Sequence, residues 1–142
     1  MRTILFTILL LSLSSGIGAR EIYVKDGLGN SGYDVVSYFT DGKAIRGNPF
    51  YESKYLGVTW RFSSEAHKQL FDANPEEYMP QYGGYCAWAV AEKDELYPTD
   101  PKAFAIKNGK LYLNYDEDVQ SDWLDDAERF IQKADKNWKH HQ

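Results

Sequence analysis

The chain has 142 residues and a formal net charge of −5, with 43% hydrophobic and 26% charged residues. These are the proportions of an ordinary globular protein, so they exclude a disordered tail, a collagen-like repeat and a coiled-coil rod. The acidic balance argues against nucleic acid as a partner, because duplex binding needs a basic surface. The length fits one domain, and the 15% of aromatic residues provide a large area for its core.

The first nineteen residues have the three-part layout of a secretory signal peptide. Arg2 precedes the apolar run Ile4–Leu13, and small residues then lead to an expected cleavage site after Ala19. The run is too short to span a bilayer, and no second apolar run follows it. We therefore expect an exported protein, periplasmic or secreted, with a soluble mature chain of residues 20–142 that forms a single domain. An uncleaved anchor or a buried helix is the alternative for residues 1–19.

The first half of the mature chain shows the patterns of short strands and one helix. In chain order, the predicted elements are the strand Glu21–Lys25, the strand or helical turn Asp34–Phe39, a hairpin of residues 51–55 and 58–62, and the helix Ser63–Asn74. The hairpin turns at Leu56-Gly57. Ser63 or Ser64 can cap the helix, and Pro75 ends it or opens a further turn.

The second half shows an apolar segment, a hairpin and an amphipathic helix. Residues 82–91 form the most apolar stretch after the signal segment, and Asn108-Gly109 predicts a hairpin of residues 103–106 and 110–114. From about Asp118 to Trp138, apolar residues recur at helical spacing, with acidic residues at the start and lysines at the end, as the helix dipole favours. Together these elements predict an α+β fold in which a small antiparallel sheet carries two packed helices.

Several separated motifs resemble the YHS domain family, and they follow the family's order. Val58–Tyr78 is similar to the second half of that domain and Gly32–Phe39 to its opening, while residues 81–90 and 100–115 resemble a longer, exported branch of the family. The matching positions within the domain are Gly57, Trp60, Phe62, Phe71, Asn74-Pro75 and Tyr78. The resemblance implies a YHS-like fold over most of Gly32–Trp138.

The resemblance also implies binding of heavy metals such as copper through cysteines of the domain. The positions of those cysteines correspond to Ser37, Ser63 and His67 in this sequence. Hydroxyl groups are poor ligands for soft metals, so only His67 keeps a suitable donor. We therefore expect the fold to persist although the sulfur ligands have been lost.

Cys86 and His67 are the candidate site residues. Cys86 is the only cysteine, which excludes an intramolecular disulfide, and no neighbouring charge lowers the pKa of its thiol, so a buried apolar role is favoured. His67 lies on an apolar helix face, where a structural histidine is the favoured interpretation. The alternative is a copper or other transition-metal site of His67 and Cys86, completed by Met79, Asp34 or another carboxylate.

Two other motifs have structural interpretations. Gly83-Gly84 is expected to make a bend or bulge rather than to let a ligand approach the backbone. His140 and His141 could together bind a transition metal weakly, but a frayed chain end is favoured.

These observations leave three functional hypotheses. We favour an exported, non-catalytic YHS-type module that binds a small ligand or a partner protein, because no nucleophile–base pair or ligand cluster is evident. The first alternative is a periplasmic copper-binding protein that uses Cys86 and His67. The second is a thiol-dependent enzyme with Cys86 as nucleophile and His67 as base.

Overall fold

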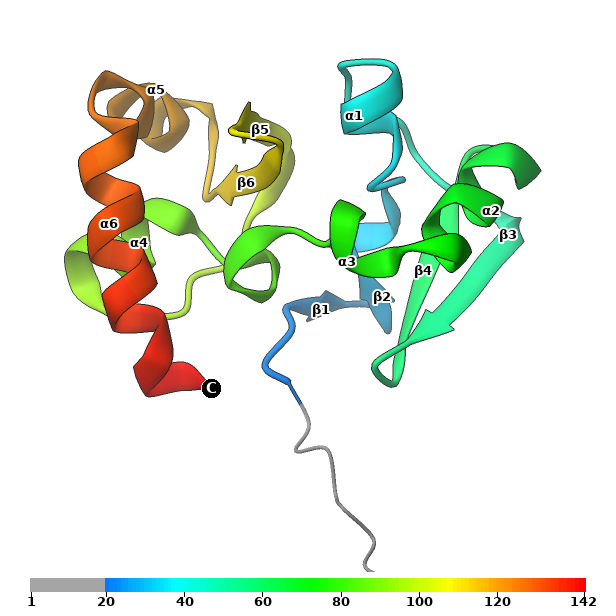
Figure 1. The fold of residues 1–142 in the computed structure, drawn as a ribbon, viewed down its shortest axis with the longest axis horizontal. Helices are drawn as coiled ribbons and strands as arrows, with labels where there is room; N and C mark the ends of the chain where they lie inside the picture. The colour runs from blue at the N-terminus through cyan, green and yellow to red at the C-terminus, as the bar shows by residue number, and fades with distance from the viewer. Residues whose placement is uncertain (1–19) are drawn as a thin grey trace, which may run out of the picture.

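The computed structural model describes residues 20–142, so the signal peptide predicted at residues 1–19 lies outside the described part. The described chain is an α+β structure with a four-stranded mixed sheet, a separate two-stranded hairpin and six α-helices (Figure 1). This confirms the predicted fold class. The detail of one antiparallel sheet with two helices is too simple, since strands β2 and β4 pair in parallel and the helical part is larger. None of the helices in residues 20–142 is long and apolar enough to cross a bilayer.

The sheet is built from the first half of the described chain. Its elements are β1 (Val24–Lys25), β2 (Leu28–Gly29), the 3-10 turn η1 (Asn30–Gly32), the short helix α1 (Ser37–Thr40), β3 (Asn48–Tyr55) and β4 (Val58–Phe62). The strand order is β1-β2-β4-β3, and β3 and β4 form the predicted hairpin. Its two turn residues, Leu56 and Gly57, have φ values of 53° and 75°, which is the left-handed backbone that a two-residue hairpin turn requires.

Helices α2 (Glu65–Ala73) and α3 (Pro75–Tyr78) follow the sheet. The helix predicted over Ser63–Asn74 is confirmed, and its cap is Ser64, whose hydroxyl accepts a hydrogen bond from the His67 backbone N–H at 3.1 Å. Pro75 opens α3 at a first-turn position, where its missing N–H costs no helical hydrogen bond. Ser63 therefore does not cap the helix, and its hydroxyl donates to Asp34 instead.

The second half of the chain consists of a hairpin surrounded by helices. Its elements are the 3-10 turn η2 (Gln81–Gly84), α4 (Ala87–Lys93), β5 (Asp100–Lys107), β6 (Lys110–Asn114), α5 (Glu117–Asp125), α6 (Ala127–Trp138) and the 3-10 turn η3 (Lys139–His141). The hairpin at Asn108-Gly109 is confirmed. The single helix predicted from Asp118 to Trp138 is wrong, because the chain leaves helical geometry at Asp126, with φ −151° and ψ 53°. Asp126 is the residue before α6, and its side chain forms an ion pair with Arg129 Nε at 2.7 Å but makes no capping hydrogen bond to the helix backbone.

Strand β6 joins two hydrophobic cores. Leu111 and Leu113 point into the first core, which includes Trp60, Phe62 and Phe71 of the sheet and α2. Tyr112, between the two leucines, points into the second core. Alternate residues of a strand face opposite sides, so one strand contributes to both cores.

The second core is formed by helices α4, α5 and α6 together with Tyr82 of η2 and Tyr112 of β6. Trp123 of α5 and Phe130 of α6 are buried in it, and the ring of Trp123 lies 5.2 Å from that of Tyr112. Figure 1 shows the two halves side by side, with β5 and β6 between the helices α4, α5 and α6 and the first half of the chain.

Candidate functional site: a buried aspartate network

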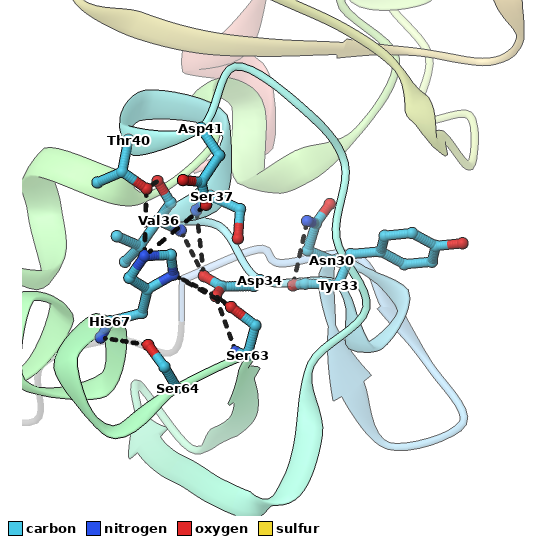
Figure 2. A network of polar contacts seen from close by, with 10 residues as sticks. All are labelled: Asn30, Tyr33, Asp34, Val36, Ser37, Thr40, Asp41, Ser63, Ser64 and His67. Atoms are coloured by element: carbon cyan, nitrogen blue, oxygen red, sulfur yellow. Dashed lines mark hydrogen bonds and ion pairs between the residues drawn. The ribbon is translucent and has the colours of Figure 1, made fainter.

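Asp34 is the centre of the most connected polar network in the first half of the structure. Its carboxylate is completely buried just before α1. Oδ1 accepts hydrogen bonds from the backbone N–H groups of Val36 at 2.8 Å and Ser37 at 3.2 Å. Oδ2 accepts from the Ser63 N–H at 2.8 Å, the Ser63 hydroxyl at 2.7 Å and His67 Nδ1 at 2.7 Å (Figure 2). One carboxylate therefore ties the start of α1 to the end of β4 and to α2.

The hydrogen bonds keep Asp34 ionised despite its burial. Burial alone would raise the pKa of this carboxyl, because it disfavours the charged form. The backbone and hydroxyl bonds from Ser63 and the bond from the His67 ring outweigh burial, so the pKa of Asp34 lies below its usual value. The network is therefore organised around a fixed negative charge.

His67 connects this buried charge to the surface. Its Nδ1 bonds to Asp34, while its Nε2 lies 3.2 Å from Thr40 Oγ1 and 3.9 Å from Asp41 Oδ2. The imidazole is 15% exposed. Figure 2 shows the ring between Asp34 on one side and Thr40 on the other, so it bridges α1 and α2.

The order Asp34, His67, Thr40 resembles an acid–base–nucleophile triad. Such a triad also needs a cleft for the substrate and donors for the developing negative charge. Two hollows in the described part of the chain, one beside Arg20–Ile22 and one beside Tyr23–Asp26, are not lined by Asp34, His67 or Thr40, and the Asp41 carboxylate next to His67 Nε2 opposes negative charge at this place. The arrangement acts as a structural bridge between two helices.

The three positions where the family resemblance implies metal ligands do lie together. Ser37, Ser63 and His67 all surround Asp34 (Figure 2). Their chemistry does not fit a soft metal such as copper, because two of the three side chains are hydroxyls. In addition, the Asp34 oxygens already accept five hydrogen bonds, one of them from His67 Nδ1. Within residues 20–142, no group of three or more His, Cys, Asp or Glu side chains is placed to hold a metal ion.

Cys86 lies in a different network from His67. It is completely buried just before α4, where its Sγ donates to Asn114 Oδ1 at 3.5 Å and accepts from the Tyr115 N–H at 3.3 Å. Burial raises the pKa of this thiol, which keeps it protonated at neutral pH. Within the described chain, His67 and Cys86 thus share no hydrogen-bond partner, and a buried neutral thiol is unsuited to act as a nucleophile. Met79, the third candidate ligand, packs in the first core.

Residues Arg20–Tyr23, which we call the N-terminal strap, cross from one half of the molecule to the other. Arg20 forms an ion pair with Glu76 of α3 at 2.5 Å, and the Tyr23 N–H donates to the Gly83 carbonyl at 2.9 Å. Gly83 has a φ of 62°, and a side chain there would collide with the Glu21 carbonyl. The glycine pair therefore makes the expected bend and also admits the chain's own backbone.

A cleft of about 720 Å³ lies beside the strap. It is lined by the strap, α3 and η2 on one side and by the first residue of β6 and the end of α6 on the other. Figure 1 shows the end of α6 facing the strap and β1. The cleft could not be predicted from the sequence, because its lining comes from segments far apart in the chain.

The sequence suggested Asp34 only as a possible metal ligand, whereas in the structure its carboxylate is the centre of the network. An aspartate two or three residues before a short helical segment is a typical acceptor for the free N–H groups of the first turn. That signal was present in the sequence. The contacts of Thr40 and Asp41 with His67 had no comparable local signal.

Residues 36–82 match the YHS domain. The chain therefore contains a YHS domain, which runs from α1 to η2 and includes Ser37, Ser63 and His67. The resemblance noted in the sequence is confirmed for this segment, while Asp34 lies just before it and the second core almost entirely after it. No curated protein and no solved structure matches the chain.

Proposed function

We propose that this chain is an exported, non-catalytic YHS-type module that binds a small ligand in the cleft beside the N-terminal strap. The observation that carries the proposal is the cleft itself. Its volume of about 720 Å³ falls in the range of about 300–1,000 Å³ that is usual for small-molecule sites. It also lies between the two halves of the molecule, which is a common position for ligand sites.

The non-catalytic part of the proposal is supported by how the reactive side chains are used. The Asp34 carboxylate and the His67 imidazole hold α1, β4 and α2 together, away from the cleft. The Cys86 thiol is buried and protonated. Neither group is available to a molecule bound beside the strap.

The binding proposal is tested by NMR titration of the mature protein with neutral, anionic and cationic naphthalene derivatives. Amide signals of η2 and the indole signal of Trp138 should shift together and saturate, because these residues line the cleft. Trp138→Ala should weaken this binding. Trp88→Ala is the matched control, since Trp88 is also a half-buried tryptophan in a helix but lies outside the cleft. Shifts confined to other surfaces, or turnover of an ester substrate that depends on His67, would contradict the proposal.

Export is tested separately by measuring the intact mass of the protein expressed in a Gram-negative host. The basic start, the apolar run and the small residues before Arg20 support cleavage after Ala19. We expect a periplasmic product that begins at Arg20. An uncleaved product retained in the cytoplasm or membrane would contradict this part of the proposal.

A further inference from the structure

Resting on the proposed function, we infer that the ligand of the cleft is a small organic anion with an aromatic or apolar body, whose negative group is bound by Lys110 and Lys139. The supporting observation is that the carboxylates lining the cleft all have hydrogen-bond partners, whereas its two lysines have none in the described chain. It assigns a chemical class to the ligand and two residues to its recognition.

The cleft is lined by three acidic and three basic side chains, but only the acidic ones are all engaged. Glu76 pairs with Arg20 at 2.5 Å and also accepts from the Tyr55 hydroxyl. Glu21 accepts from the Tyr85 hydroxyl at 2.6 Å, and Asp135 from the Tyr82 hydroxyl at 2.9 Å. All three carboxylates therefore accept hydrogen bonds from protein donors, but only Glu76 has a cationic partner, since the donors to Glu21 and Asp135 are neutral hydroxyls.

Lys110 and Lys139 are the two basic residues that remain. Both are exposed at the cleft, and neither forms an ion pair or a side-chain hydrogen bond within residues 20–142. Lys110 begins β6 and Lys139 follows α6, so the two ammonium groups come from different elements. Two unpaired cations in one cleft are unusual for a chain whose net charge is −5. They offer hydrogen bonds to an anionic group, and hydrogen bonds to charged groups are the stronger kind.

The remaining lining supplies an apolar surface. Met79 and Tyr82 are buried beneath the cleft, and Trp138 is half buried with its ring 6.0 Å from that of Tyr82 in an edge-on arrangement. An aromatic or aliphatic body can pack against these side chains while its charged end reaches the lysines. Aromatic packing of this kind adds specific geometry to the area that is buried.

The experiment compares three probes that share one ring system: 2-naphthoate, 2-naphthylmethanol and 2-naphthylmethylammonium. Dissociation constants are measured by the NMR titration described above. We expect the anion to bind several-fold more tightly than the neutral alcohol, because two exposed ammonium groups attract it while water screens the attraction. The cation should bind most weakly, and the preference for the anion should shrink at high salt.

Substitutions of the two lysines test whether they cause the preference for the anion. Lys110→Gln and Lys139→Gln should each weaken binding of 2-naphthoate towards that of the alcohol and leave binding of the alcohol unchanged. Lys136→Gln, an exposed lysine of α6 outside the cleft, is the matched control and should change neither.

The outcomes separate this inference from the proposed function. Equal binding of all three probes in the cleft, tightest binding of the cation, or an unchanged anion affinity in both lysine variants would overturn the ligand class while the cleft remains a binding site. If no probe shifts the cleft signals, both the ligand class and the proposed function fail.

Discussion

Asp34 shows how a single buried charge can organise three segments of chain. Its carboxylate accepts five hydrogen bonds from α1, the residue after β4 and α2. A buried carboxylate is costly to desolvate, and only such complete hydrogen bonding makes its burial tolerable. The side chain and its donors must therefore be considered as one unit.

Replacement of Asp34 tests that unit. Asp34→Asn removes the charge and turns one acceptor oxygen into a donor that faces other donors. We expect the free energy of unfolding to fall by about 3–5 kcal/mol, the usual cost of breaking a buried charged network by removing one partner. Urea denaturation measures it. Asp122→Asn, an exposed aspartate of α5, is the control and should change stability little; equal effects of the two variants would contradict the role of Asp34.

The lowered pKa of Asp34 also predicts how stability depends on pH. An unfolded aspartate titrates near pH 3.9, as model peptides do. Because the pKa of Asp34 in the folded protein lies below that value, the unfolded state takes up the proton first as pH falls. The stability difference between wild type and Asp34→Asn should therefore shrink as pH falls below about 4. A difference that grows on acidification would contradict the direction of the shift.

Cys86 gives a simple residue-scale test of burial. The thiol is completely buried and its pKa is raised, so a thiol reagent should label it only after denaturant is added. Mass spectrometry of native and unfolded samples measures the labelling. Rapid stoichiometric labelling of the native protein would contradict the burial of Cys86 and support the hypothesis of a thiol-dependent enzyme.

At the scale of elements, the N-terminal strap depends on Gly83. The residue combines a positive φ of 62° with close approach of the Glu21 carbonyl. Gly109 has a positive φ of 72° but open space around it, so it suffers only the backbone strain of a substitution. A comparison of substitutions at Gly83 and Gly109 therefore separates the effect of backbone strain from the effect of a steric collision.

We therefore expect Gly83→Ala to lower stability more than Gly109→Ala. Strain at such backbone positions costs on the order of 1–3 kcal/mol in both variants, and only Gly83→Ala must also displace the strap. Thermal melting and the NMR signals of Arg20–Tyr23 measure this. An equal loss in the two variants, with the strap signals unchanged, would contradict the docking of the strap.

The elements also show which features of the fold could be predicted from sequence. The hairpins at Leu56-Gly57 and Asn108-Gly109 were predictable because their signals are local turn residues. The network of Asp34 was not, since its bonds to Ser63 and His67 join residues 29 and 33 positions apart. The local sequence indicated Ser63 as one of two possible helix caps, but in the structure its hydroxyl donates to the Asp34 carboxylate. The break at Asp126 was not predicted either, because the apolar residues keep their helical spacing on both sides of it.

At the scale of the whole molecule, β6 makes the two cores interdependent. Leu111 and Leu113 belong to the first core and Tyr112 to the second. A disturbance in the helical half should therefore reach the sheet through one strand. We expect a single cooperative unfolding transition, with far-UV circular dichroism and tryptophan fluorescence coinciding.

Trp123→Ala tests this coupling. The Trp123 side chain is fully buried and packs on Tyr112, so its removal should cost about 3–5 kcal/mol. Leu124→Ala is the control, because the neighbouring Leu124 is 47% exposed and should matter little. The two spectroscopic transitions should shift together in Trp123→Ala; a separation of the two would show that the cores unfold independently.

The central claim is that hydrogen bonds around Asp34, and not a bound metal, hold the YHS domain together. The most direct test is to measure the metal content of the mature protein after exposure to copper or zinc and removal of free ions, together with its melting temperature with and without a chelator. We predict substoichiometric metal and an unchanged melting temperature. One tightly held ion per chain that raises the melting temperature and is lost in His67→Ala would contradict the account.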